Sequence, residues 1–184
     1  KPVFTINLNG SGSTVKGFTI TGGTSFTSSG IRLNSASNCT IQSNKITGNR
    51  IGLYISGLST NNNIFNNYIQ NNTGNGILLY SKNNTITGNN ISNNYAGIWI
   101  YSRDNLISRN IVSNNRGFGI YIEGSNNNYL YGNTISNNNY GVYFFESNFE
   151  MHFNQIFGNQ YGVYSDLAGF LNALKLAGKK IEDI

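Results

Sequence analysis

The sequence predicts an all-β protein that folds as a single-stranded, right-handed parallel β-helix. We expect three parallel sheets, about seven coils of about 22 residues, and a capping α-helix at the C-terminal end. A Gly-apolar-x-apolar element recurs every 21 to 24 residues, and self-similarity at such a period is typical of solenoids. Its apolar residues alternate at a period of two, which indicates strands rather than helices. The glycines of this element are Gly30, Gly52, Gly76, Gly97, Gly119, Gly141 and Gly162.

An apolar-x-x-Asn-x-Ile element accompanies the first one in each period. Its asparagines form a first column, Asn44, Asn67, Asn89, Asn110, Asn133 and Asn154. Five residues later comes a second column, Asn49, Asn72, Asn94, Asn115, Asn138 and Asn159. One period therefore holds three short strands separated by Asn and Gly corners. Each strand is too short to bury a face alone, so we expect it to stack on its copy in the next coil, about 4.8 Å away.

The asparagines have two physical reasons to stand at corners. Asn tolerates the left-handed backbone conformation better than other residues that carry a side chain. An inward-pointing Asn can also hydrogen-bond the backbone of its corner and the Asn stacked above it. We therefore predict that both columns form buried ladders of stacked amides.

The pattern Ile-x-x-Asn-x-Ile-x-x-Asn-x-x-Gly-Ile-x-Leu resembles the parallel β-helix repeats of NosD-like proteins. These repeats are also called carbohydrate-binding and sugar-hydrolysis domains, within the pectin-lyase-like superfamily. The resemblance covers about residues 1–165 and rests on core and corner positions, so it is specific for fold rather than function. It implies a secreted, periplasmic or cell-surface protein. Relatives of NosD are associated with copper handling, but one Cys, one His and one Met are too few soft ligands, and we expect no metal and no cofactor.

The composition changes abruptly after Ser165, and we place the domain boundary there. Residues 1–165 form the β-helix, and residues 166–184 form a cap. Within the cap, an apolar stripe at helical spacing predicts a helix over residues 167–177, which would cover the last coil. An amphipathic helix that binds a partner is the alternative. The N-terminal end shows no equivalent cap, so we expect a neighbouring domain there.

The composition favours sugars over other partners. Charged residues make up 10% of the chain, and the net charge of +5 is scattered rather than gathered in a run. Asn makes up about a fifth of the chain, and a surface rich in amides and hydroxyls suits a polysaccharide or another glycan better than nucleic acid. No apolar run is long enough for membrane insertion. The single cysteine, Cys39, excludes an internal disulfide.

The candidate binding site is a strip of aromatic side chains on the outer face of the first strand in each coil. These side chains lie between or just beyond the inward apolar pair and stack from coil to coil. Such a strip offers apolar ring faces to sugar rings. Cross-strand aromatic pairs also stabilise sheets by themselves, by up to about 1 kcal/mol each, and a partner could cover the strip instead. The predicted sugar contacts are Tyr54, Tyr80, Trp99, Tyr101, Tyr121 and Tyr143.

Acidic residues are few, and the candidates for catalysis are Glu123, Glu146 and His152. Glu123 and Glu146 fall in adjacent coils, one position out of register, at the end of the strip. Glycosidases hold two carboxyl groups about 5–9.5 Å apart, which adjacent coils can supply. Solvent-exposed rim charges are the simpler interpretation. We therefore favour a non-catalytic carbohydrate-binding or surface module, with a polysaccharide lyase, epimerase or glycoside hydrolase as the alternative and a purely structural solenoid as the third interpretation.

Overall fold

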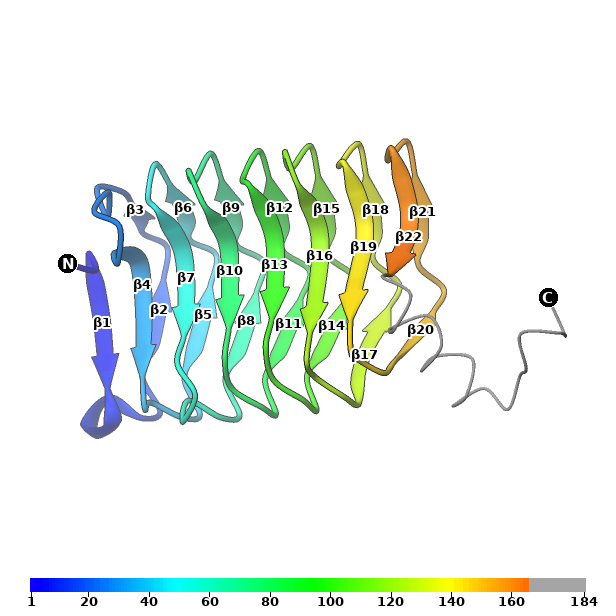
Figure 1. The fold of residues 1–184 in the computed structure, drawn as a ribbon. Helices are drawn as coiled ribbons and strands as arrows, with labels where there is room; N and C mark the ends of the chain where they lie inside the picture. The colour runs from blue at the N-terminus through cyan, green and yellow to red at the C-terminus, as the bar shows by residue number, and fades with distance from the viewer. Residues whose placement is uncertain (166–184) are drawn as a thin grey trace, which may run out of the picture.

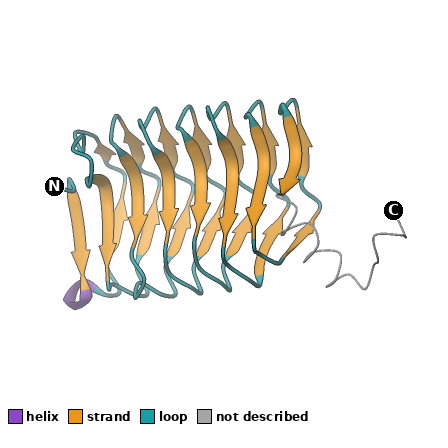
Figure 2. Cartoon of the chain, viewed as in Figure 1, coloured by secondary structure: helices purple, strands orange, loops and turns teal. Residues whose placement is uncertain are grey.

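The computed structural model describes residues 1–165, which wind into a right-handed parallel β-helix with three sheets along its length (Figure 1). Strands and tight corners make up nearly all of this part of the chain (Figure 2). One 3₁₀ turn, η1 (Leu8–Gly10), is the only helical segment in residues 1–165. The predicted β-helix with about seven coils is confirmed. The predicted cap over residues 166–184 lies outside the described residues.

Each coil contributes one strand to each of the three sheets, and every strand pairs in parallel with its copy in the next coil. Sheet A contains β1 (Phe4–Asn7), β4 (Ser29–Asn34), β7 (Ile51–Ile55), β10 (Asn75–Leu79), β13 (Ala96–Ile100), β16 (Phe118–Glu123), β19 (Tyr140–Phe145) and β22 (Tyr161–Ser165). Sheet B contains β2 (Thr14–Lys16), β5 (Thr40–Gln42), β8 (Asn63–Phe65), β11 (Thr85–Thr87), β14 (Leu106–Ser108), β17 (Asn128–Tyr131) and β20 (Phe149–His152). Sheet C contains β3 (Thr19–Ile20), β6 (Lys45–Thr47), β9 (Tyr68–Gln70), β12 (Asn90–Ser92), β15 (Ile111–Ser113), β18 (Thr134–Ser136) and β21 (Gln155–Phe157).

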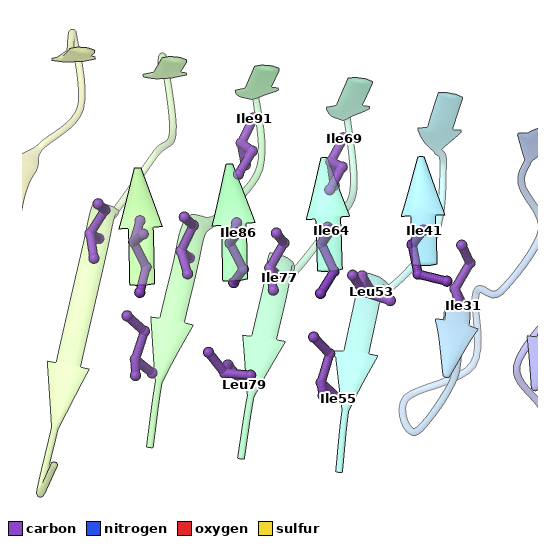
Figure 3. Packing of buried hydrophobic residues seen from close by; sticks show 14 of the residues in the cluster. Ile31, Ile41, Leu53, Ile55, Ile64, Ile69, Ile77, Leu79, Ile86 and Ile91 are labelled. Carbon is purple, nitrogen blue, oxygen red and sulfur yellow. The ribbon is translucent and has the colours of Figure 1, made fainter. Parts of the chain in front are cut away.

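The core is a set of aliphatic columns that run along the axis of the solenoid. Ile77 and Leu79 of β10 point inward with Ile86 of β11 and Ile91 of β12, and all four are fully buried (Figure 3). The neighbouring coils place Ile, Leu or Val at the same positions. The alternation of apolar residues therefore faces inward in all three sheets, as the sequence predicts.

The repeated glycine of sheet A is required by space. A Cβ atom on Gly97 would lie 2.5 Å from the carbonyl oxygen of Gly119 and 2.5 Å from Cγ1 of Val112. Gly52, Gly76, Gly119 and Gly141 meet the same obstacles in their own coils. The glycines are thus strand residues at which the backbone of the next coil approaches closely, and not the corners that the sequence pattern suggests.

Both predicted Asn ladders are present and are fully hydrogen-bonded. The backbone N–H and Nδ2 of Asn89 donate to Oδ1 of Asn110 in the next coil, at 2.9 and 3.0 Å. Asn89 Nδ2 also donates to the carbonyl of Ile64 in the preceding coil, at 2.9 Å. The second ladder repeats this geometry, for example between Asn94 and Asn115. Each amide therefore links three consecutive coils and satisfies buried backbone groups.

A third ladder was not predicted from the sequence. Asn62, Asn84, Asn105 and Asn128 stack at the corner before sheet B, and the backbone N–H of each of the first three donates to Oδ1 of the next. Cys39 begins this column, and its N–H donates to Oδ1 of Asn62 at 2.8 Å. Each of these asparagines stands five residues before a member of the first ladder, which is the signal that could have found it.

The left-handed conformation lies one residue earlier than the sequence analysis expects. The ladder asparagines do not have positive φ angles; the residue before each of them does. Asn66, Gly88 and Arg109, with φ of 54°, 65° and 53°, precede successive members of the first ladder. At each corner, the residue with the positive φ turns the chain, and the ladder Asn that follows it fills the interior with its amide.

Candidate functional site

The outer face of sheet A carries the predicted aromatic strip. Trp99 pairs with Leu78 on one side and Tyr121 on the other, and Tyr143 follows Tyr121. Their neighbours Ile98 and Ile100 are fully buried, whereas Trp99, Tyr121 and Tyr143 are half-buried. The column contains Arg32, Tyr54, Leu78, Trp99, Tyr121, Tyr143 and Tyr164. The predicted outward direction of these side chains is therefore confirmed.

A second outward column was missed in the sequence analysis. Phe118, Tyr140 and Tyr161 stack beside the strip, because their strands begin one residue before the glycine of the repeat. Phe118 lies 4.9 Å from the ring of Tyr121 and 5.3 Å from the ring of Tyr143, measured between ring centroids. The position directly before each glycine was the signal available in the sequence.

The ring planes divide this face into two kinds of surface. Tyr80 and Tyr101 are parallel, with centroids 4.5 Å apart and planes 2° apart, so each ring covers a face of the other. Trp99 is also nearly parallel to Tyr101, at 14°, whereas Trp99 and Tyr121 are tilted by 40° and Tyr121 meets Tyr143 edge to face at 84°. Parallel stacks leave ring edges and hydroxyls toward solvent. Trp99 contacts Tyr121 and Tyr121 contacts Tyr143, with ring centroids 4.6 and 4.9 Å apart, so a ligand on this part of the strip must lie across its outer surface rather than between the rings.

Glu123 is hydrogen-bonded to the aromatic face of sheet A. The indole Nε1–H of Trp99 donates to Oε2 of Glu123 at 3.0 Å. The hydroxyl of Tyr101 is hydrogen-bonded to the same carboxylate and to the hydroxyl of Tyr80. Four side chains from three coils thus form one network, with the carboxylate at its centre. Such a network holds the indole plane in a fixed direction.

The tyrosine hydroxyls in this network hold their protons tightly. Burial raises the pKa of Tyr101, and the hydrogen bond and negative charge of Glu123 raise it further. Burial also raises the pKa of Tyr80, with a smaller contribution from Tyr54. Both hydroxyls are therefore neutral at physiological pH and can donate and accept hydrogen bonds.

The structure does not bring the three candidate catalytic residues together. Glu123 pairs with Phe145, so Glu146 lies one position beyond it, exposed and with a φ of 45°. His152 lies on β20 in sheet B, where its Nε2 is 3.5 Å from Oε2 of Glu150. Glu123 is therefore the one candidate that belongs to the aromatic face.

The soft metal ligands are also dispersed. Cys39 is buried near the N-terminal end, where its thiol contacts the carbonyls of Gly10 and Ser37. Met151 packs against the core at the opposite end, next to the exposed His152. Residues 1–165 contain no group of three His, Cys, Asp or Glu side chains that could hold a metal ion. The described residues therefore do not fit a copper centre. In this same range, no helix combines the length and apolar character needed to cross a membrane.

The chain is similar to solved structures of much longer β-helix proteins. A crystal structure of the periplasmic alginate epimerase AlgG, a double mutant, is 30% identical over 75% of this chain and 34% of that chain, with a TM-score of 0.62. The enzymatically active domain of bacteriophage CBA120 tailspike protein 2 is 17% identical over 88% of this chain and 32% of that chain, with a TM-score of 0.65. The chain thus spans about a third of either relative. No curated protein matches it.

The family comparison covers nearly the whole described solenoid. The model of a family described as periplasmic copper-binding protein (NosD) matches residues 4–155. That range contains the first and third Asn ladders and all but the last coil of the second ladder and of the aromatic face, since Asn159, Tyr161 and Tyr164 follow it. It also contains Cys39, which lies near the other end of the solenoid from Met151 and His152, too far away to share a metal ion with them. On the extent of this match, the chain belongs to the NosD family of parallel β-helix proteins.

Proposed function

We propose that the protein is an extracellular, non-catalytic carbohydrate-binding module whose site is the aromatic face of sheet A. The observation that carries the proposal is the position of Trp99, which is half-buried, tilted against Tyr121 and fixed by Glu123. An aromatic face beside a fixed carboxylate and neutral hydroxyls offers stacking and hydrogen bonds to a sugar ring together. The predicted contacts Tyr54, Tyr80, Trp99, Tyr101, Tyr121 and Tyr143 all lie on this face.

The ring geometry narrows the site within the strip. Tyr80 and Tyr101 occupy each other's faces, so they contribute hydroxyl groups rather than stacking surfaces. Trp99, Tyr121 and Tyr143 change plane from coil to coil and together present one continuous, half-buried aromatic surface to solvent. We expect the centre of the glycan site at these three residues, with the other members of the strip along its edges.

We also propose that the protein is secreted, periplasmic or located at the cell surface. The family is described as periplasmic, and one of the similar structures is named as a periplasmic enzyme. A glycan-binding surface has its partners in those compartments.

The fluorescence of Trp99, the single tryptophan of the chain, tests the proposal at one residue. An oligosaccharide that stacks there should shift its emission saturably, and Trp99→Ala should weaken binding at least tenfold without unfolding the protein. Tyr131→Ala, on sheet B, is the matched control and should bind as the wild type does. Two results would refute the proposal: a Trp99 that quenchers cannot reach, or an accessible Trp99 that no glycan in a broad panel affects.

A polysaccharide-active enzyme is the second candidate. It is supported by the similarity to structures named as an epimerase and as an enzymatically active domain, and by the place of Glu123 in the aromatic face. Glu123→Gln separates the two functions. If the protein is a binding module, the wild type and Glu123→Gln should bind glycans with the same stoichiometry. Neither protein should then release new reducing or unsaturated ends. Release of such ends by the wild type, lost in Glu123→Gln, would identify an enzyme.

A further inference from the structure

A hollow lies away from sheet A, at the corner between sheets B and C. Its volume is about 440 Å³, within the range of about 300–1,000 Å³ of small-molecule sites. The hollow exists because the middle coil carries small residues where its neighbours carry large ones. Gly88 and Asn90 form its floor, Asn66 and Tyr68 form one wall, and Arg109 and Ile111 form the other.

The walls of this hollow combine three kinds of chemistry. Tyr68 and Ile111 project from sheet C on either side of Asn90 and are 58% and 49% exposed. They supply an aromatic ring and an aliphatic side chain that face solvent. The amides of Asn66 and Asn90 supply hydrogen-bond donors and acceptors between them. This is a surface that can hold one face of a sugar ring and its hydroxyls.

Arg109 supplies a positive charge that no acid neutralises. The two ion pairs within residues 1–165 join Arg103 to Asp104 and His152 to Glu150, and Arg109 takes part in neither. Its backbone has a φ of 53°, whereas the adjacent coils have glycine at this position, at Gly88 and Gly132. The same column of corner residues also holds Ser43, Asn66 and Phe153 at positive φ, and Arg109 is its one cationic member.

We propose that this hollow, lined by Tyr68, Asn90 and Arg109, binds an anionic sugar unit, with its carboxylate on Arg109 and its ring against Tyr68. A guanidinium binds a carboxylate through two parallel hydrogen bonds, which gives both affinity and direction. No carboxylate side chain lines the hollow to repel the ligand. This site is independent of the aromatic face, because it lies on a different corner of the solenoid.

Titration with digalacturonate tests the proposal, with the neutral digalactose of the same linkage as the matched ligand. The charged sugar should bind at least tenfold more tightly, and the amide resonances of Gly88 and Asn90 should move in a two-dimensional NMR spectrum. Arg109→Gln should weaken binding of digalacturonate at least tenfold and leave the neutral sugar unaffected. Arg103→Gln removes the same charge from another corner and should change neither affinity.

Tyr68→Ala provides a second variant that touches no buried residue, and it should weaken both sugars. Equal affinities for the two sugars, an Arg109→Gln variant that binds like the wild type, or shifts confined to sheet A would overturn the proposal. The fluorescence of Trp99 reports only on sheet A. If no glycan changes that fluorescence but digalacturonate still shifts the Gly88 amide resonance, the result supports this site and rejects the proposed function.

Discussion

The three Asn ladders inside the solenoid and the aromatic face outside sheet A are both columns that run along the same axis, but they differ in uniformity. The ladders place Asn at the same corner in coil after coil, and their members make nearly identical hydrogen bonds. The outer strip changes at every step, from Arg32 to Tyr54 to Leu78 to Trp99. Its ring planes range from parallel to perpendicular.

The difference follows from what each column must satisfy. A buried backbone group needs its partner in every coil, because an unmade hydrogen bond costs about 1–3 kcal/mol. An outward side chain has solvent as an alternative partner, so it is free to vary. Uniform columns therefore report on the fold, whereas the outer columns are free to take the residues that a surface function requires. The Arg109 hollow follows the same logic, as the one long cationic side chain in a column of corner residues.

Gly97→Ala should break the interior most severely. The added Cβ would lie 2.5 Å from two atoms of the adjacent elements, one of them backbone, so the next coil must move. We expect a loss of about 3 kcal/mol or more in the free energy of unfolding, measured by urea denaturation. Gly57→Ala is the matched control, because its Cβ would meet its nearest neighbour at 3.7 Å and should change stability by less than about 0.5 kcal/mol. Equal losses at both glycines would contradict the role of close approach.

Asn110→Ala should have the next largest effect. It removes the acceptor of the Asn89 N–H and Nδ2 and the donor to the Ile86 carbonyl, all of them buried. We expect a loss of about 1–3 kcal/mol, seen as a lower urea midpoint. Asn139→Ala is the control, since the Asn139 Oδ1 is buried without a partner and its removal costs no hydrogen bond. A control as unstable as Asn110→Ala would show that the ladder contributes nothing specific.

Tyr101→Phe should have the smallest effect and should appear mainly in the pH dependence. The pKa of Tyr101 is raised in the folded state, so the folded protein holds this proton more tightly than the unfolded chain. The resulting stability is complete below the ordinary tyrosine pKa of about 10 and is lost as the pH rises above it. Tyr101→Phe should cost less than about 1 kcal/mol at neutral pH and should flatten the alkaline loss, measured by urea denaturation from neutral to alkaline pH. An unchanged alkaline slope would show that other groups cause it.

Sequence periodicity predicted the sheets, the core and two of the three ladders, because these features repeat and a repeat is visible without coordinates. It missed the Asn62 ladder, which is shorter and begins with Cys39 instead of Asn. It assigned the left-handed conformation to the ladder asparagines, although the preceding residues turn the chain and include Ser43 and Phe153. A corner position with such varied residues has no recognisable pattern.

The candidate site was predicted less completely. The inward and outward alternation correctly placed Trp99 and its neighbours on the surface of sheet A. The network around Glu123 joins three coils and depends on which way the long side chains lean, and spacing in the sequence does not contain that direction. The hollow beside Arg109 arises from a small residue between large ones in adjacent coils, so it becomes visible only once the register of the coils is known.

The backbone N–H groups of the ladder asparagines all donate toward the next coil, and this gives the solenoid a direction of assembly. The N–H of each ladder Asn is satisfied by the Oδ1 of the coil that follows it, as with Asn67 and Asn89. At the N-terminal end, Phe18 and Gly23 are satisfied in the same way by Asn44 and Asn49, so the first coil needs no asparagine of its own. Each new coil therefore completes the one before it. A chain that emerges from the ribosome or a secretion pore with its N-terminus first can fold vectorially, with every finished coil serving as the template for the next.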